Sequence, residues 1–537
     1  MRCTRLAQVA VLCSIALVAL VAPVASAAPA TGGTLAYQLS SQPAGIDPLF
    51  ASDFTAAVVV DALFDGLTSW DSKTSAVLPA VASSWQANAD VTVWTFHLRA
   101  DARFSNGTRV TAQDFKFAWE QLLTGADKAW GSYLLNDVKG SAALAAGSAK
   151  HLSGVVVRNR TTLVVQLTTP FADFPSTVAN PSLAPLPRGL LSTAEKAASY
   201  HDAPVGNGPF MLAEPWNGAS TISLAAAPAY YGTKPHIAGI RFTVIADRAT
   251  AYAQFQAGVL DVARFPAASL AEVQAAFGTS ADGFTAQPGH QVIQGPRAGI
   301  NYCVFNTKLA PLDNVLVRRA FSLALDRSKF AAAIYGMAPR ELPTDMLSPG
   351  VPGYVPGQWR YAKLDLAEAA ALLAEAGYPG GAGLPEITFL TPGDAYLSEY
   401  KTDLAAIGVN VRLVVEASYE QFYAKWNSGT FMMFQEGWTD DVPTADNVLY
   451  NLFYGPLDGS DSFYDDPAVN ASLRRARATR NTAARVTAFE SIDATIGADA
   501  PVTPVAYITR SVVCSARLHE AVLSPMNLFD FTRVWMQ

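Results

Sequence analysis

Residues 386–415 constrain the fold more than any other part of the sequence. The stretch "EITFL" at 386–390 is typical of a buried strand, residues 398–407 of a helix, and "VNVRLVV" at 409–415 of a second strand. A strand, a helix and a strand over so short a span predict a βαβ unit, in which the strands are parallel and the crossover is right-handed. The sequence therefore predicts an α/β protein.

A further strand is predicted at "FMMF" (431–434), and "GWTDD" (437–441) follows it. Ligands of open α/β sheets bind outside the carboxyl ends of the strands. We therefore expect Trp438 and Asp441 to lie just past this strand, at a ligand site. Asp440 and Asp441 are adjacent carboxylates that repel each other, so they require either full solvation or a cationic partner.

The N-terminus has the pattern of an export signal. Arg2 and Arg5 precede a largely apolar run at 6–22, and Ala-Ser-Ala at 25–27 fits a small-residue cleavage site. The run is short of the ~20 residues of a membrane span. We expect residues 1–27 to be a signal peptide and the protein to be secreted, to the periplasm or the outer face of the cell envelope. Whether it is retained at the membrane stays open.

Composition limits the partners. The 537 residues carry a formal charge of −7 and are 50% apolar. An acidic chain is a poor partner for nucleic acid or an anionic membrane, and this length suggests roughly two to four domains. Cys303 and Cys514 are the cysteines that remain after the signal; sequence alone leaves open whether they form a disulfide.

The sequence lacks the motifs of common catalytic and metal sites. Its six histidines are isolated, with no HExxH pair, and it has neither a P-loop nor a GxSxG elbow. We therefore expect no catalytic residue, no metal and no cofactor. A secreted hydrolase stays open as an alternative, because catalytic triads are assembled in space rather than in sequence.

Several ordered stretches of the chain have a familiar pattern. They are "SSQPAGIDPLF", "DALFDGLTSWD", "WTFHLRADARFSNGTRVTAQDFKFAWEQLL", "FNTKLAPLDNVLVRRAFSLALDRSKF" and "LLAEAGYPGGAGLPEITFL". Together they resemble the family 5 extracellular solute-binding proteins, the dipeptide- and oligopeptide-binding proteins of ABC importers. The resemblance runs from about Gly33 to about Val522.

This resemblance implies a two-lobe periplasmic-binding-protein-like fold (type II) with an extra domain inserted in the first lobe. The implied limits are 34–70 with 186–299 and 506–537 for the first lobe, 71–185 for the inserted domain, and 300–505 for the second lobe. It also implies a monomeric receptor, not an enzyme, that captures peptides between two closing lobes and delivers them to the permease of an ABC transporter.

The resemblance also implies the main site residues. In the family, the backbone of a GW-x-x-D stretch pairs with the peptide and its aspartate holds the peptide's α-ammonium. That pattern falls here on Gly437, Trp438 and Asp441. Oligopeptide binders often have a cysteine directly after this tryptophan; here the position is Thr439, so Cys303 lacks that partner.

Weaker candidates follow from the same resemblance. Tyr133 in "GSYLL" and Tyr507 in "VAYI" are candidate ligand contacts, and the segment around Ser41 and Gln42 resembles the strand that lines the opposite side of the peptide. Asp440 is a further candidate, since one acid or both could face the ligand.

The ligand class keeps one alternative within the family. Relatives carry nickel chelates, haem, opines or oligosaccharides. Stacked aromatic side chains favour a sugar, and tryptophans such as Trp426 and Trp438 leave an oligosaccharide open. A carboxylate on the GW pattern favours an amine as ligand. Every peptide with a free N-terminus carries such a group, its α-ammonium, whatever its sequence.

Overall fold

The computed structural model describes residues 31–50, 53–125, 130–391, 393, 397–457 and 461–537. The expected signal peptide lies outside the described residues. Within them, no helix combines the length and the apolar character needed to span a membrane.

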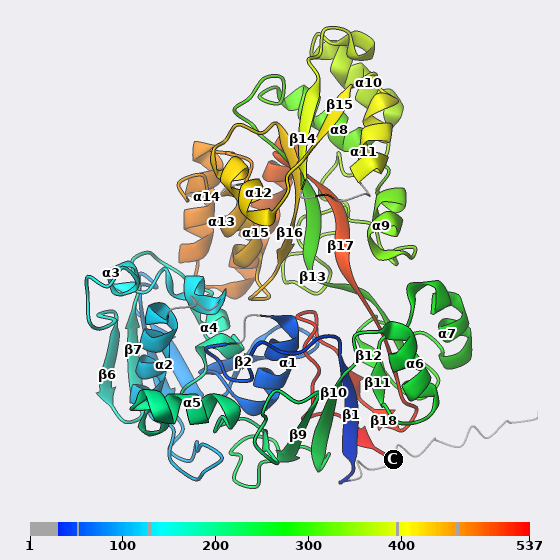
Figure 1. Cartoon of the computed structure of the whole chain (residues 1–537). Helices are drawn as coiled ribbons and strands as arrows, with labels where there is room; N and C mark the ends of the chain where they lie inside the picture. The colour runs from blue at the N-terminus through cyan, green and yellow to red at the C-terminus, as the bar shows by residue number, and fades with distance from the viewer. Residues whose placement is uncertain (1–30, 51–52, 126–129, 392, 394–396, 458–460) are drawn as a thin grey trace, which may run out of the picture.

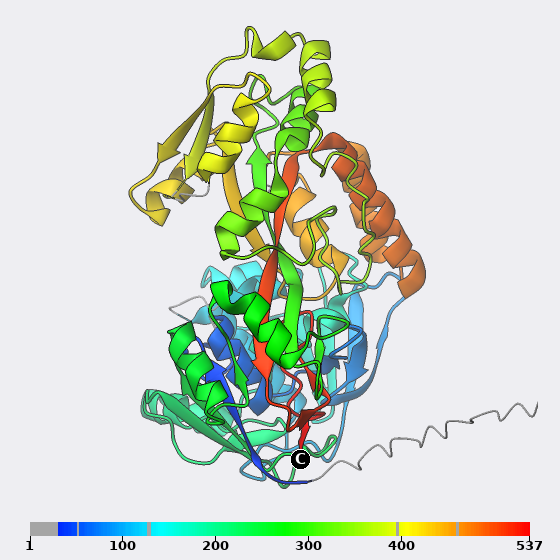
Figure 2. The ribbon, with the colours of Figure 1, turned by 90° about the vertical axis from the view of Figure 1, so that its right-hand side faces the viewer.

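A mixed ten-stranded sheet runs through the molecule from top to bottom in Figure 1. Two long strands at its centre belong to the upper and the lower part at once, as Figure 2 shows. The strand order is β15 (Val411–Val415), β14 (Ile387–Thr391), β16 (Met433–Thr439), β13 (Val292–Phe305), β17 (Val502–Cys514), β11 (Val262–Ala263), β1 (Thr34–Leu39), β10 (Gly239–Val244), β9 (Thr221–Ala226) and β8 (Phe210–Leu212).

Three parts are distinguished by their strands. We call the part around β1 and β8 to β11 the first lobe, the part around β14 to β16 the second lobe, and the part with a separate four-stranded antiparallel sheet the inserted domain. Its sheet has the order β4 (Ala82–Ala87), β5 (Val93–Leu98), β7 (Thr162–Gln166) and β6 (Val155–Asn159). In Figure 1 the second lobe lies above the other two parts.

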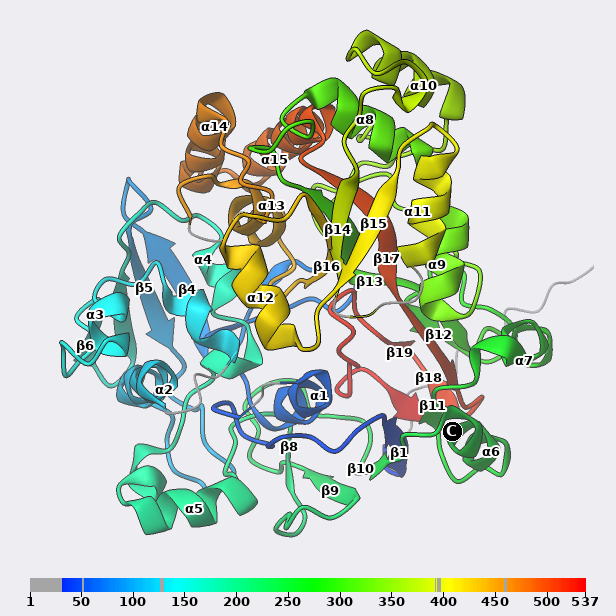
Figure 3. The ribbon, with the colours of Figure 1, turned by 45° about the horizontal axis from the view of Figure 1, so that its top comes forward.

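The predicted βαβ unit is confirmed in the second lobe. β14 and β15 pair in parallel from Ile387 with Val411 to Thr391 with Val415, and a helix connects them. Helices cover both faces of this part of the sheet, as Figure 3 shows. One face carries α8 (Val315–Ala324), α9 (Arg327–Tyr335), α10 (Leu366–Glu375) and α11 (Leu397–Ala405), and the other α12 (Tyr419–Asn427), α13 (Ala445–Phe453), α14 (Pro467–Ala478) and α15 (Thr482–Asp499).

The inserted domain buries a helix against its sheet. α2 (Ala112–Thr124) begins with a capping box, in which the Thr111 backbone N–H donates to the Asp114 carboxylate over 2.8 Å. Its apolar face, with Phe115 and Trp119 fully buried, packs on the strands. Further elements are β2 (Thr68–Trp70), β3 (Val77–Pro79), α3 (Ser141–Ala145), α4 (Phe174–Thr177) and 3₁₀ turns at Trp130–Leu135, Pro181–Leu183 and Arg188–Leu191.

The remaining elements complete the lower part of the molecule and one connection above it. They are α1 (Phe54–Leu63), α5 (Ala194–Asp202), α6 (Arg248–Gln256), α7 (Leu270–Phe277), the pairs β12 (Thr285–Ala286) with β19 (Ala521–Val522) and β18 (Leu518–His519) with β20 (Trp535–Met536), and 3₁₀ turns at Ala267–Ser269 and Pro379–Gly381.

The chain enters the second lobe along β13 and returns along β17. These strands pair from Val292 with Val513 to Val304 with Val502, and the register is interrupted between Pro296 and Ile300. The implied limits between the lobes, at 299/300 and 505/506, fall inside this strand pair and stay a prediction.

The two cysteines are free and buried, and they belong to different cores. Cys303 packs in the second lobe and Cys514 in the first, so the disulfide that the sequence left open does not form. Burial raises the pKa of Cys514 to about 12 and raises that of Cys303 further, so neither thiol is ionised near neutral pH.

Candidate functional site

β16 is longer than the sequence predicted, because the long neighbour β13 supplies ladder partners as far as Thr439. Gly437 pairs with Asn301 and Trp438 with Ile300. The expectation that Trp438 lies past the strand is therefore wrong: it lies within β16. Asp441 does follow the end of the strand, as expected.

The outer edge of β16 is open along its second half. β14 pairs only with Met433 and Phe434, and no other strand of the described chain pairs with this edge further on. The Gly437 N–H donates to the carboxylate of its neighbour Glu436 over 2.9 Å instead of to a strand. A free edge of this kind can accept an extended peptide as an additional strand.

A cleft of about 660 Å³ lies along this edge, between the second lobe and the inserted domain. Five carboxylates and one guanidinium line it, so the lining is markedly acidic. Its charged and aromatic residues are Tyr133, Asp137, Phe171, Tyr302, Tyr423, Trp426, Glu436, Trp438, Asp441, Asp446, Tyr450, Asp461 and Arg477.

Asp441 is fixed at one end of this cleft by both parts. Tyr133 of the inserted domain donates to its Oδ2 over 2.6 Å, and Asn180 donates to its carbonyl over 2.8 Å. Its own N–H donates to Asn447 Oδ1 of α13 over 3.2 Å. Burial, and then the Asp441 carboxylate, raise the pKa of Tyr133 well above its ordinary value, so this hydroxyl stays protonated and donates. The structure thus brings the predicted residues Tyr133 and Asp441 into direct contact.

Asp440 has different surroundings from its neighbour. Its side chain is 4% exposed, and none of the described residues hydrogen-bonds its carboxyl group. Burial, and then Asp441, raise its pKa well above the ordinary value, while Arg297 opposes the shift. Asp440 lines a second, smaller cavity of about 160 Å³, to which Asp441 also belongs.

Tyr507 lies in the core of the second lobe. It is 2% exposed, its ring contacts that of Tyr354 edge to face, and its hydroxyl is 3.5 Å from the carbonyl oxygen of Asp345. These contacts are those of a packed core residue.

Ser41 and Gln42 follow β1 rather than forming part of a strand. The Ser41 hydroxyl is 2.9 Å from the Thr55 hydroxyl, and Gln42 donates to the Gly218 carbonyl over 2.9 Å. The first-lobe residues that line the smaller cavity include Phe54, the first residue of α1.

Sequence reasoning missed Phe54, Asn180 and Arg297. Phe54 carried a signal, since it is a large apolar residue directly after the helix cap Asp53, and it is 39% exposed. Asn180 and Arg297 are brought to Asp440 and Asp441 only by folding, because they lie more than a hundred residues away along the chain.

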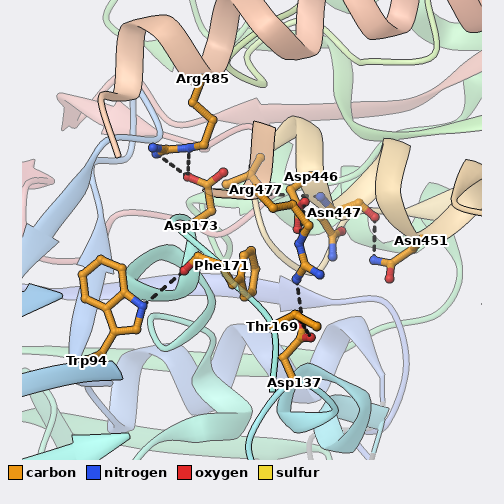
Figure 4. Close-up of polar contacts among 11 residues, drawn as sticks. Trp94, Asp137, Thr169, Phe171, Asp173, Asp446, Asn447, Asn451, Arg477 and Arg485 are labelled. Carbon is orange, nitrogen blue, oxygen red and sulfur yellow. Dashed lines mark hydrogen bonds and ion pairs between the residues drawn. The ribbon is translucent and has the colours of Figure 1, made fainter. Parts of the chain in front are cut away.

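One arginine, Arg477, is the guanidinium in the lining of the acidic cleft. Arg477 of α14 forms ion pairs with Asp137 of the inserted domain (2.5 Å) and Asp446 of α13 (3.1 Å). Its guanidinium lies between the rings of Phe171 and Tyr450, 4.1 and 3.9 Å from their centroids. Figure 4 shows this arginine reaching across from the second lobe to the inserted domain.

A second ion pair joins the same two parts. Arg485 of α15 donates twice to one oxygen of Asp173, over 2.6 and 3.0 Å (Figure 4). Both arginines are over 90% buried. The inserted domain and the second lobe are therefore held together by desolvated, paired charges.

Another cavity of about 640 Å³ lies in the lower part of the molecule. Asp65 in its lining is half-buried, accepts hydrogen bonds from Tyr230 and Tyr231 and is satisfied within the protein. The cleft along β16 is the better candidate because it combines a free strand edge with a carboxylate at its end. Among the described residues, no three His, Cys, Asp or Glu side chains are grouped to hold a metal ion.

The fold and the cleft define a two-lobe solute-binding protein of the type II class. A model of the bacterial extracellular solute-binding proteins, family 5, matches residues 76–459, and the chain belongs to this family.

Named relatives agree with this family, and a solved structure agrees with the fold. The periplasmic oligopeptide-binding protein OppA of Haemophilus influenzae is 27% identical over 485 residues, which are 87% of this chain and 86% of the relative. A probable deoxycholate-binding periplasmic protein of Escherichia coli, YgiS, is 26% identical over 486 residues, 88% and 87% of the two chains. The periplasmic murein tripeptide-binding protein MppA in its unliganded open form superposes with a TM-score of 0.80 at 24% identity, covering 95% of this chain and 98% of that one.

Proposed function

We propose that this protein is an exported receptor that captures short peptides between its lobes and delivers them to the permease of an ABC transporter. The observation that carries the proposal is the position of Asp441, a fixed carboxylate at the end of a cleft that follows the free edge of β16. The OppA relative, named for oligopeptide binding, supports the same ligand class.

The chemistry of the cleft fits an extended peptide of varied sequence. Main-chain groups of the ligand pair with the β16 edge at Gly437, while the α-ammonium, mostly cationic at neutral pH, lies against Asp441. A carboxylate and an ammonium form a charge-assisted hydrogen bond, which is stronger than a neutral one. Trp438 faces the same cleft and packs beside the ligand.

Delivery depends on a change of shape around the ligand. The first lobe ends at 299 and resumes at 506, the inserted domain spans 71–185, and the second lobe spans 300–505, so β13 and β17 form the hinge. Closure on the peptide creates the surface that the permease recognises, and peptide binding raises the population of that closed state. The receptor acts as a monomer outside the cytoplasm, after removal of residues 1–27.

Calorimetric titration of the mature protein with Ala-Ala-Ala and with its N-acetylated form tests the proposal. We expect acetylation and Asp441→Asn each to weaken binding by on the order of 3 kcal/mol, about 100-fold, because each leaves one buried charge unpaired. Asp101→Asn, an exposed acid of the inserted domain, is the control and keeps full affinity. Equal binding of the acetylated peptide would overturn the role of Asp441.

Two further outcomes of that titration are informative. The aromatic lining around Trp426, Trp438 and Tyr423 favours an oligosaccharide as the second candidate ligand, so binding of sugars without peptides would replace the proposal. The peptide is expected to be recovered intact by mass spectrometry, since we propose a receptor; its hydrolysis would identify an enzyme instead.

A further inference from the structure

The smaller cavity, of about 160 Å³, lies where all three parts of the molecule meet. We call it the junction cavity. It adjoins the cleft, because Thr439 and Asp441 line both. Its remaining lining is Asp53, Phe54, Ala57, Trp70, Gly131, Asn180, Pro181, Ser182, Arg297, Asp440, Met526 and Leu528.

Arg297 brings a positive charge to the junction cavity and has no charged partner there. The residue lies in the interruption of the β13–β17 register, between Pro296 and Ile300. Its guanidinium is 5.4 Å from the centroid of the Phe54 ring. Among the described residues it forms neither a hydrogen bond nor an ion pair within 4 Å, although it is largely buried. An unpaired desolvated cation is costly unless something pairs with it.

Asp440 supplies a carboxyl group to the same cavity. Its side chain is 4% exposed, and its carboxyl group has no hydrogen-bond partner in the described chain. Arg297 and Asp440 are not within ion-pair distance of each other, and only their long-range attraction is felt. The junction cavity thus holds a guanidinium and a carboxyl group, and neither has a direct hydrogen-bond or ion-pair partner among the described residues.

A ligand that carries both charges on one short segment would satisfy both groups. The first residue of a peptide does so when its side chain is acidic: its ammonium and its carboxylate are a few bonds apart. The cavity, of about 160 Å³, has the volume of about five waters and can accommodate an acidic side chain. Because Asp441 borders both cavities, a peptide held along β16 directs its first residue to this place.

We propose that the junction cavity selects peptides whose first residue is Asp or Glu, with the side-chain carboxylate on Arg297 and the α-ammonium between Asp440 and Asp441. This assignment rests on the proposed peptide-binding function and adds its sequence preference. The carboxylate is matched to the guanidinium, whose planar donors bind carboxylates in pairs.

Calorimetry at pH 7 with four tripeptides tests the preference: Glu-Ala-Ala, Gln-Ala-Ala, Ala-Ala-Ala and Ala-Glu-Ala. Glu-Ala-Ala is expected to bind at least about 10-fold more tightly than Gln-Ala-Ala, which has the same shape without the charge. Ala-Glu-Ala is the control for charge at the wrong place and is expected to bind like Ala-Ala-Ala.

The variants assign the preference to Arg297. In Arg297→Gln the advantage of Glu-Ala-Ala over Gln-Ala-Ala is expected to disappear, and in Arg297→Lys to return in part. Arg241→Gln, which removes an exposed arginine of the first lobe, keeps the wild-type ratio.

The outcomes that overturn the proposal are distinct from those that overturn the peptide function. Equal affinity of the wild-type protein for Glu-Ala-Ala and Gln-Ala-Ala refutes the preference without any variant, and an unchanged ratio in Arg297→Gln refutes the role of Arg297. If tripeptides bind with equal affinity, only this inference fails. If no tripeptide binds, the peptide function fails and this inference with it.

Discussion

Arg477 and Arg297 both lie where the second lobe meets the rest of the chain, but their partners differ. Arg477 has two carboxylates within 3.1 Å and an aromatic ring on each face of its guanidinium. Arg297 has one aromatic ring and no carboxylate within ion-pair distance. The first contact is complete without a ligand and joins two parts of the protein. The second is incomplete, which is the expected state of a group that a ligand completes.

The largest expected effect is on the free energy of unfolding and comes from Arg477, the arginine with two ion pairs. Arg477→Met removes the guanidinium and leaves Asp137 and Asp446 without their cation, so the free energy of unfolding is expected to fall by about 3–5 kcal/mol. Urea denaturation measures this change. Arg475→Met, an exposed arginine on the same helix, is the control and is expected to change it by less than about 0.5 kcal/mol. A similarly small effect at Arg477 would remove the contrast.

Asp461, a buried acid of the cleft, gives a pH-dependent measure of what an unpaired buried charge costs. Asp461 is 6% exposed and accepts a hydrogen bond of 2.5 Å from Tyr302; burial raises its pKa to about 7. Between about pH 4 and pH 7 the folded protein keeps a proton that the unfolded chain releases. The contribution of Asp461 to the free energy of unfolding is therefore full below about pH 4. It is lost as the pH rises to about 7, and the loss is about 4 kcal/mol at most.

Asp461→Asn removes this titration. Urea denaturation at pH values from 4.5 to 7.5 is expected to give a variant whose stability falls less steeply with rising pH than that of the wild-type protein. Parallel profiles for the two proteins would show that Asp461 does not hold the proton.

Arg297, which has no ion pair, is expected to contribute much less to the free energy of unfolding than Arg477. Arg297→Met replaces a partly buried charge that has no ion pair, so the free energy of unfolding without ligand should stay within about 1 kcal/mol or rise. The same urea titration measures it. A loss of about 3 kcal/mol or more would mean that Arg297 is already paired in the free protein.

The smallest effect is a proton released on binding. Because burial and Asp441 raise the pKa of Asp440 well above its ordinary value, its carboxyl group keeps a proton more readily than that of an ordinary aspartate. An ammonium in the junction cavity favours the ionised form, so peptide binding at pH 7 should release up to about one proton. Calorimetry in two buffers of different ionisation enthalpy measures this. Asp440→Asn should abolish the buffer dependence; its persistence in the variant would assign the proton to another group.

Local pattern was sufficient to predict much of the second lobe. Apolar runs and turn residues gave the parallel pair β14 and β15 and the helix between them, since each is determined by neighbours within about 30 residues. The capping box of Thr111 and Asp114 in α2 likewise depends on residues only three positions apart. The length of β16 could not be predicted from local pattern, because its end depends on pairing with β13, more than a hundred residues earlier.

The site was predicted only in part for the same physical reason. Asp441 and Tyr133 were both expected and they form a hydrogen bond, although 308 residues separate them. Their choice came from a family resemblance, which carries three-dimensional information that a single pattern does not. Arg297 has no such pattern, and only the closeness of β13 to the end of β16 brings it near Asp440.

The strand order determines which lobe can fold first during synthesis. β1, near the start of the chain, has β10 and β11 as neighbours, and β11 needs β17, which ends at Cys514. The buried core around β1 also includes Phe529, Phe531 and Met536. The first lobe therefore cannot complete its core until nearly the last residue has been synthesised. The strands β14 to β16 of the second lobe and the helices that cover them are all synthesised earlier. In a nascent chain held short of its C-terminus, the second lobe should consequently resist protease, and the first lobe should be digested.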